Sequence, residues 1–224
     1  MIGRVSAVTE EYLEVIYRLQ QRSRVARTSD IVKFLQVVPG TVTNTIERLE
    51  RKGLVIHKPY KGIKLTKRGY KIALDVIRRH RLSERLLTDI LNVKWYKAHT
   101  AACCLEHDIT GEIVESLERI LGYPKTCPHG NPIPTGSGKI LEEDTENITD
   151  LRLQEKGVIV KIAEEESELL RQIDSLDLKP GKSVKVIKTS VKGPVTVEIG
   201  EVSYTISHKV AALVKVKKEM GSGS

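Results

Sequence analysis

Four side chains that commonly bind transition metals lie on one predicted helix: His99, Cys103, Glu106 and His107. At about 100° per residue, these positions span an arc of about 100°, so two imidazoles, a thiolate and a carboxylate project to one side of the helix. A mixture of nitrogen, oxygen and sulfur donors suits a borderline transition metal, whereas magnesium and calcium sites are built from oxygen atoms. The residue types and their spacing therefore predict a transition-metal site.

A second pair of potential ligands, His80 and Glu84, lies on the preceding predicted helix. Their i, i+4 spacing places them about 40° apart around the helix axis, so the two side chains share a face. Taken singly, such residues are more often structural. A helical cysteine is usually a small buried hydrophobe, and a lone histidine or glutamate usually lies at the surface or is hydrogen-bonded in the core. Six of them with helical periodicity on two helices favour the metal site.

The composition places these helices in a basic protein with 224 residues and a formal net charge of +8. The positive charge suits a polyanionic partner such as nucleic acid. No apolar run approaches the ~18 residues that a membrane span requires, and the N-terminus lacks the apolar stretch of a signal peptide, so we expect a cytoplasmic protein with no membrane partner. The three cysteines are too few for a disulfide framework and are expected to be reduced.

The N-terminal part has the pattern of a winged helix-turn-helix. An amphipathic helix is followed by a short helix that Thr28 or Ser29 can cap, and then by a third helix over residues 39–53, with proline near its start and glycine at its end. Two β-prone runs, residues 54–57 and 63–66, flank a lysine-rich hairpin tip. This order of elements predicts a DNA-binding domain over residues 1–70.

The third helix carries short polar side chains near its N-terminal end, which lets the backbone approach base edges in the major groove. Alternatively, these side chains are only solvent-exposed polar residues of types that favour helix caps and turns. The lysines of the hairpin can likewise serve only to keep an exposed strand edge solvated and protected from pairing. The basic wing beside the helix favours DNA contact. The predicted DNA-binding residues are Thr28, Ser29, Thr41, Thr43, Asn44 and Arg48 in the helices, and Lys58, Lys61 and Lys64 in the hairpin.

The remaining sequence predicts a mainly α protein with a small β domain at its C-terminal end. A stretch rich in loop formers leads into an acidic, poorly periodic segment that is typical of a linker. Five β-prone runs punctuated by Pro-Gly and Gly-Pro pairs then suggest a small barrel of SH3 type, without a catalytic arrangement. The predicted parts are a helical metal-binding and dimerisation domain over residues 71–140, a linker over 141–154, an SH3-like domain over 155–219 and a flexible tail over 220–224.

Four segments carry a resemblance to a known family. They are residues 39–43 (PGTVT), 80–87 (HRLSERLL), 99–107 (HTAACCLEH) and 127–134 (CPHGNPIP). In combination, and over nearly the whole chain, they closely resemble the diphtheria toxin repressor family of iron- and manganese-dependent regulators. The resemblance implies a homodimer in which a divalent metal ties the N-terminal helix to the dimerisation helices. Two recognition helices would then reach the spacing required by an inverted-repeat operator on double-stranded DNA.

The resemblance also implies a primary and an ancillary metal site. The iron branch has a thioether at the position of Glu11, and the manganese branch has carboxylates at the positions of both Glu11 and Cys103, so this chain combines features of both. A thiolate favours iron(II), cobalt, nickel or zinc over manganese, and we expect Fe2+ first and Mn2+ next, with Co2+, Ni2+ and Zn2+ as alternatives. The implied primary ligands are Glu11, Cys103, Glu106 and His107, the ancillary ones are Glu84 and His99, and His80 is ancillary in the iron branch but primary in the manganese branch.

Two further features leave alternatives open. Some manganese-branch relatives use the counterparts of Cys127 and His129 as ligands beside the glutamate that matches Glu84. Alternatively, this segment is only a tight turn that ends the middle domain. The family can also take an ancillary carboxylate from the region of residues 164–168, for which Glu164 is our candidate. Alternatively, the acidic residues there only complement the dipole of a helix.

These observations predict a metal-dependent, DNA-binding transcriptional repressor that controls metal homeostasis. One alternative is a metal-independent winged-helix regulator whose histidines and cysteines are structural. The other is a metallo-enzyme that uses Glu106 or Glu84 as a base beside a bound ion. The enzyme alternative is inferior because the sequence has neither a glycine-rich phosphate loop nor a nucleophile with a base partner.

Overall fold

The computed structural model describes residues 5–190 and 193–219. The tail predicted over residues 220–224 therefore lies outside the described residues. Within the described part, no helix combines the length and the apolar character that crossing a membrane would require.

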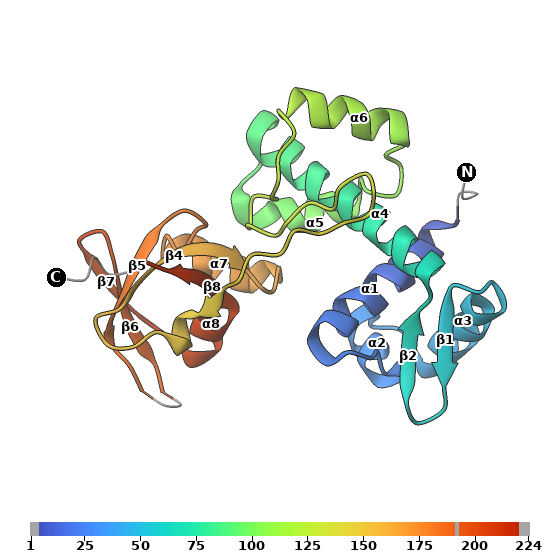
Figure 1. Cartoon of the computed structure of the whole chain (residues 1–224), viewed down its shortest axis with the longest axis horizontal. Coiled ribbons are helices and arrows are strands. Elements are labelled where there is room, and N and C mark those ends of the chain that lie inside the picture. The colour runs from blue at the N-terminus through green and yellow to red at the C-terminus, as the bar shows by residue number, and fades with distance from the viewer. Residues whose placement is uncertain (1–4, 191–192, 220–224) are drawn as a thin grey trace. The chain divides into compact units, whose positions relative to one another are not determined.

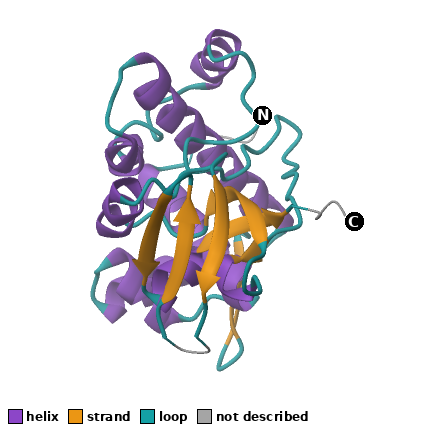
Figure 2. Ribbon diagram, turned by 90° about the vertical axis from the view of Figure 1, so that its left-hand side faces the viewer, coloured by secondary structure: helices purple, strands orange, loops and turns teal. Residues whose placement is uncertain are grey.

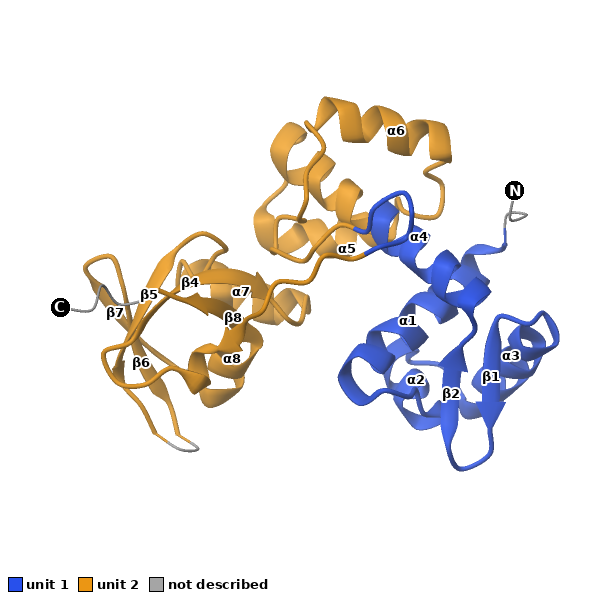
Figure 3. Ribbon diagram, viewed as in Figure 1, with its two compact units in different colours: residues 1–79, 134–139 blue, residues 80–133, 140–224 orange. Residues whose placement is uncertain are grey.

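The chain separates into two units (Figure 3). The first comprises residues 1–79 with residues 134–139, and the second comprises residues 80–133 with residues 140–224.

The first unit contains the predicted winged helix-turn-helix (Figure 1). Ser6 caps the first helix, because its side chain accepts a hydrogen bond from the Thr9 backbone N–H at 3.4 Å. Pro39 begins the third helix, where a missing N–H breaks no helical hydrogen bond. Apolar residues three and four positions apart on these helices, such as Leu13 and Ile16, are fully buried in the core. The elements are α1 (Ala7–Ser23), α2 (Thr28–Leu35), α3 (Pro39–Arg51), β1 (Val55–Lys58), β2 (Gly62–Leu65) and the start of α4 (Lys67–Arg85).

The second unit begins with the end of α4 and a layer of shorter helices. The helix that carries His80 and Glu84 is α-helical to Arg85 and continues as a π-helical turn, η1 (Leu86–Ile90). Leu82 of α4 packs in one apolar cluster with Val114 and Leu117 of the helix α6 (Gly111–Ile120). The further elements of this layer are η2 (Trp95–Lys97) and α5 (Ala98–Cys103).

The helix predicted to carry all four ligands from His99 to His107 is shorter than expected. Helix α5 ends at Cys103, and residues 104–108 form turns. The N–H groups of Cys104 and Leu105 donate to carbonyls three residues back, at 3.2 and 2.9 Å, which is tighter than the α-helical pattern. The chain must then become extended at Thr110, the N-cap of α6. Turns rather than a continuous helix therefore place the last two predicted ligands.

The C-terminal part of the second unit is an antiparallel sheet of six strands in the order β3-β8-β4-β5-β6-β7 (Figure 2). Alternate residues of its strands, such as Val195, Val197 and Ile199, face the core. This confirms the predicted small β domain. The elements are β3 (Glu146–Asn147), η3 (Ile148–Asp150), β4 (Lys156–Ile162), α7 (Ser167–Ser175), β5 (Ser183–Lys188), β6 (Val195–Ile199), β7 (Val202–Ile206), α8 (His208–Leu213) and β8 (Val214–Lys218).

The linker predicted over residues 141–154 is partly folded into this domain. Strand β3 pairs with β8, and Ile148 and Leu151 are buried in the core of the sheet. The segment lacked periodicity because each element in it is only two or three residues long. The sheet domain therefore begins within the predicted linker.

Candidate metal centre and DNA interface

His80 and Glu84 form the centre of a buried cluster in the second unit. Both side chains are fully buried, and His80 Nε2 lies 3.1 Å from Glu84 Oε1. Helix α4 positions them one turn apart, while Leu82 between them packs in an apolar cluster. Ionisable groups are rarely buried to this degree unless they are paired or bind a metal.

Helix α5 brings two more donors to this pair. His99 Nδ1 lies 2.9 Å from His80 Nε2 and 3.2 Å from Glu84 Oε1. Cys103 joins the two histidines in a group whose ligand atoms lie within 4.8 Å of one another. The structure thus brings together His80, Glu84, His99 and Cys103, which the sequence assigned to two facing helices.

A second donor group shares Glu84 with the first. It contains Cys127, His129 and Glu165, and all four members are buried with ligand atoms within 4.8 Å of one another. His129 Nδ1 lies 3.2 Å from Glu84 Oε1 and 3.4 Å from Glu165 Oε1, and the Cys127 thiol donates to Glu165 Oε1 at 3.7 Å. Glu165 also lies in a group with His80, Glu84 and His99. This last group and the group with Cys127 and His129 therefore share two carboxylates, those of Glu84 and Glu165.

The segment over residues 127–131 is also the tight turn that its sequence suggested. The Gly130 N–H donates to the Cys127 carbonyl at 2.9 Å, and Gly130 has a φ of 86°. A Cβ at this position would lie 1.9 Å from the Val160 carbonyl oxygen, so only glycine lets the turn pack against β4. His129 Nε2 contacts the Trp95 carbonyl at 3.1 Å, which leaves Nδ1 directed into the cluster. The turn and ligand interpretations are therefore compatible.

The C-terminal carboxylate in the cluster comes from Glu165 rather than from the predicted Glu164. Glu165 is 7% exposed, whereas Glu164 is half-buried and belongs to none of the donor groups among the described residues. The Asn131 side-chain amide donates to Glu165 Oε1 at 2.8 Å and to the Ile162 carbonyl at 3.0 Å. The prediction missed Glu165 because neighbouring residues of an extended segment face opposite ways, and the sequence contains no signal that fixes which one faces inward.

Of the other predicted primary-site residues, Glu106 borders the cluster and shares a further donor group with His80, whereas Glu11 and His107 belong to none of the donor groups among the described residues. Glu106 is buried, with its Oε2 atom 2.5 Å from His80 Nδ1, and His107 Nε2 lies 3.3 Å from Glu106 Oε1. Glu11 belongs to the first unit, where it is exposed on α1. Its neighbours Glu10 and Glu14 are the buried carboxylates of that helix; they pair with Arg79 and Arg18, respectively, each at 2.8 Å.

The buried carboxylate of Glu84 controls the protonation of the cluster. Burial disfavours the charged form of His80, but the Glu84 charge and hydrogen bonds to Cys103, Glu106 and Glu84 outweigh it, so the pKa of His80 is raised well above 6.5. Burial likewise opposes ionisation of Glu84, but the His80 charge and hydrogen bonds from three histidines hold its pKa well below 4.5. Glu84 is therefore ionised while His80 carries a proton.

The second donor group behaves similarly. Burial lowers the pKa of His129, but hydrogen bonds with Cys127, Glu165 and Glu84 outweigh it and leave that pKa well above 6.5. Burial and the Glu84 charge raise the pKa of the Cys127 thiol to about 11. At neutral pH this group therefore holds protons at the positions that a metal would occupy.

One buried atom in the cluster supports a metal at these residues. Among the described residues, Glu84 Oε2 is buried without a hydrogen-bond partner, and His129 Nδ1 lies nearby, 3.2 Å from Glu84 Oε1. Buried polar atoms are normally hydrogen-bonded, and exceptions require an explanation such as an ion. The donor set of imidazole, carboxylate and thiol fits a borderline divalent transition metal.

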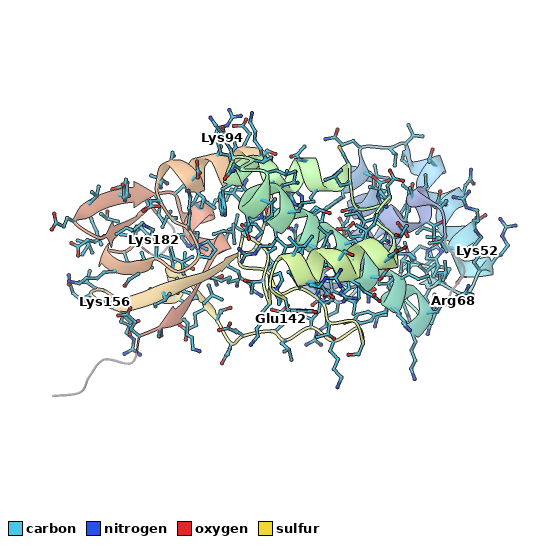
Figure 4. All side chains as sticks on the ribbon, turned by 90° about the horizontal axis from the view of Figure 1, so that it is seen from above. Lys52, Arg68, Lys94, Glu142, Lys156 and Lys182 are labelled. Atoms are coloured by element: carbon cyan, nitrogen blue, oxygen red, sulfur yellow. The ribbon has the colours of Figure 1, made fainter. Side chains whose placement is uncertain are left out.

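The predicted DNA-binding side chains form an exposed surface on the first unit. Thr41, Thr43 and Asn44 are exposed on the first turns of α3, while Val42 between them is buried in the core. Exposed Lys52 and Arg68 add positive charge to the same unit (Figure 4). The remaining predicted contacts are also exposed, except for the half-buried Thr28: Ser29, Arg48, Lys58, Lys61 and Lys64.

Comparison with known protein families accounts for most of the chain. Residues 4–63 match the N-terminal DNA-binding domain of iron-dependent repressors, and residues 66–135 match their metal-binding and dimerisation domain. Residues 147–218 match the FeoA domain. The fold and the matches define a class: a winged-helix DNA-binding protein with a metal-binding dimerisation domain and an SH3-like domain.

Individual relatives agree with this class. The chain is 33% identical to the iron-dependent repressor IdeR of Mycobacterium tuberculosis, over 94% of this chain and 96% of that protein. It is 34% identical to the diphtheria toxin repressor of Corynebacterium glutamicum, over 95% of this chain and 97% of that protein. A manganese-dependent transcriptional repressor in complex with manganese has a TM-score of 0.84 at 25% identity, covering 94% of this chain and 100% of that one. The chain belongs to the diphtheria toxin repressor family, which consists of DNA-binding repressors rather than enzymes.

Proposed function

We propose that this chain is a transcriptional repressor that binds an inverted-repeat operator as a homodimer when a divalent transition metal occupies its donor cluster. The observation that carries the proposal is the convergence of His80, Glu84, His99 and Glu165, within 4.8 Å, in a chain that also contains a winged helix-turn-helix. We propose Fe2+ as the first candidate and Mn2+ as the second, because the thiols at Cys103 and Cys127 favour Fe2+ over Mn2+ and because availability rather than raw affinity usually decides which ion is bound in a cell.

Each part of the cluster has its own task in this proposal. Glu84 and Glu165 belong together to two of the donor groups and would hold the ion from α4 and from the sheet domain. Asn131 orients Glu165, and the Trp95 carbonyl orients His129, as outer-shell partners commonly do. A bound divalent ion supplies the positive charge that protonated imidazoles otherwise provide. The ion therefore favours one arrangement of α4, α5, the turn and the sheet domain.

For the primary site we retain the ligand set implied by the family resemblance: Glu11, Cys103, Glu106 and His107. Glu11 would be the one ligand of this set in the DNA-binding domain, and through it metal binding would affect the recognition helices. Exposed apolar side chains on α6, Ile113 and Ile120 at 45% and 65% exposure, support a dimer that buries this helix.

Specific DNA binding is expected to strengthen roughly 100-fold when metal is added, within the range of measured allosteric couplings. The measurement is selection from a randomised duplex pool under anaerobic conditions, with Fe2+, with Mn2+ or with a chelator. The selected sequence should be an inverted repeat with half-site centres about one helical turn, ~34 Å, or a multiple of that apart. Tight, specific binding that a chelator leaves unchanged would instead support the metal-independent regulator.

Glu11→Gln tests the proposed link between the metal site and the DNA-binding domain. The variant should still dimerise and bind metal more weakly, but metal and operator should no longer strengthen each other's binding.

Substitutions on the first unit should separate base reading from backbone binding. Asn44→Ala is expected to weaken binding to the preferred operator by about 1–3 kcal/mol and to relax base preference at one position. Lys61→Ala should weaken binding to all duplexes alike and lower the salt slope by about one unit. Both are measured by titrating operator and scrambled duplexes at several salt concentrations. Unchanged base preference in Asn44→Ala would contradict the assignment of α3 as the recognition helix.

A further inference from the structure

Tyr60 occupies an unusual backbone position at the tip of the hairpin between β1 and β2. The Lys61 N–H donates to the Lys58 carbonyl at 3.0 Å, which closes a four-residue turn, and Tyr60, the third residue, has a φ of 62°. Pro59, the second residue, has its φ fixed near −65° by its ring, so the turn is of type II. That turn normally has glycine at its third position, because an L side chain is strained there. Tyrosine is therefore unfavourable for the hairpin itself.

Packing within the described chain does not compensate for this strain. Tyr60 has a relative exposure of 109%, so no described side chain covers its ring. Tyr70 of the same unit, by contrast, packs against Tyr17 with ring centroids 5.5 Å apart. A bulky residue held in a strained and fully exposed position points to a partner outside the chain, since strain of this kind is typical of binding sites.

The base of the hairpin is anchored, so the position of its tip is defined relative to α3. Ala26 and Ile63 exchange two backbone hydrogen bonds, at 3.0 and 2.8 Å. The His57 N–H donates to Glu50 Oε1 at 2.8 Å, which ties β1 to the helix proposed to read the operator. Tyr60 therefore projects from a fixed support beside the recognition helix.

The surroundings of Tyr60 suit a polyanion. The strand register pairs Ile56 with Lys64 and Lys58 with Gly62, so Lys58 and Lys64 lie on the same exposed face of the hairpin. Lys61, also exposed, follows Tyr60 directly. Lysines attract phosphate groups, and a phenol adds a hydroxyl donor and a flat apolar ring that lysine lacks.

We propose that Tyr60 contacts the DNA backbone: its hydroxyl donates a hydrogen bond to a phosphate, and its ring packs on the adjoining sugar at the minor-groove edge. The inference rests on the proposed function, because it requires the first unit to bind duplex DNA. Such a contact positions the protein without reading sequence, so Tyr60 acts on all duplexes alike.

Tyr60→Gly tests this proposal because it should change stability and DNA binding in opposite directions. Glycine relieves the backbone strain, so the thermal unfolding midpoint should rise by about 2–4 °C. Affinity for operator and scrambled duplexes, measured by fluorescence anisotropy with saturating Mn2+, should fall roughly tenfold for both. Tyr60→Phe keeps the strain and loses only the hydroxyl, so its midpoint should not change while its affinity falls by a smaller factor.

Gln154→Gly is the matched control. Gln154 is exposed, has a φ of 68° and lies in the sheet domain, so glycine should raise the midpoint there and leave DNA affinity unchanged. A Tyr60→Gly protein that binds both duplexes like wild type, or that has a lowered midpoint, overturns the inference alone. A metal-loaded wild type that binds neither duplex overturns the proposed function and the inference with it.

Discussion

Replacing Glu84 by glutamine is expected to weaken metal binding by the buried cluster at least about 100-fold. Glu84 Oε1 lies 3.1 Å from His80 Nε2 and 3.2 Å from both His99 Nδ1 and His129 Nδ1. Its carboxylate belongs to the group with His80, His99 and Glu165 and to the group with Cys127, His129 and Glu165, so an ion bound by either of these groups would lose a ligand. Glutamine keeps the shape of the side chain but removes its charge. Replacing a residue that only hydrogen-bonds to a metal ligand already lowers metal affinity by about 10–100-fold, and replacing a ligand itself should lower it more.

The experiment is calorimetric titration with Mn2+ and, under anaerobic conditions, Fe2+. Glu164→Gln is the matched control, because Glu164 is adjacent to the ligand Glu165 but lies outside the donor groups, so its variant should bind like wild type. Cys127→Ser should have an intermediate effect, because it removes a donor from one group only. Wild-type affinity and stoichiometry in a folded Glu84→Gln protein would show that the cluster is structural.

The central part of this cluster could be predicted because local sequence patterns determine it. The i, i+4 spacing of His80 and Glu84 fixes their common face on any regular helix, and the apolar positions of α4 fix which face is buried. β-prone runs punctuated by Pro-Gly and Gly-Pro pairs located most strands of the sheet domain. Helical periodicity and strand composition therefore identified the central pair and the sheet domain.

The remaining parts depend on tertiary contacts that leave no local pattern. Glu165 enters the cluster because Asn131 and Ile162 hold the segment after β4 in one register, and the sequence does not reveal this contact. Glu106 and His107 lie in turns after α5 because the chain must leave the helix before α6 begins, although their spacing also fits a longer helix. Tyr60 was missed for another reason: Pro-Tyr-Lys-Gly indicates a turn, but the positive φ at tyrosine is apparent only in the structure.

Metal binding by the cluster is expected to release protons and to weaken steeply as the pH falls. The pKa values of His80 and His129 are raised above 6.5, and the pKa of the Cys127 thiol is raised to about 11, so all three hold protons at neutral pH when no metal is bound. A metal binds neutral imidazole and thiolate, so each ligand must lose its proton. Each released proton changes the affinity about tenfold per pH unit, so the two histidines alone should give about 100-fold per unit below their pKa values.

The same protons should give the metal-free and metal-bound chains opposite pH dependences of stability. Without metal, the raised pKa values of His80 and His129 stabilise the fold fully below about pH 6.5, and this contribution is lost as the pH rises through the folded pKa values. The lowered pKa of Glu84 contributes stability above about pH 4.5, which is lost as the pH falls through its folded value. The cluster should therefore stabilise the metal-free chain most between these limits. With metal at fixed concentration, stability should instead increase as the pH rises past 6.5, because tighter binding favours the folded state.

The measurement is the free energy of unfolding in urea at several pH values from 5 to 9, with Mn2+ or with a chelator. Calorimetry in buffers of different ionisation enthalpy would count the protons released. Glu84→Gln should partly flatten the metal-free curve, because His80 and His129 then lose one of the charges that raise their pKa values. If both curves change with pH in the same direction and metal binding releases no protons, the cluster does not exchange its protons for metal. The buried histidines and carboxylates would then serve only to hold α4, α5 and the sheet domain together.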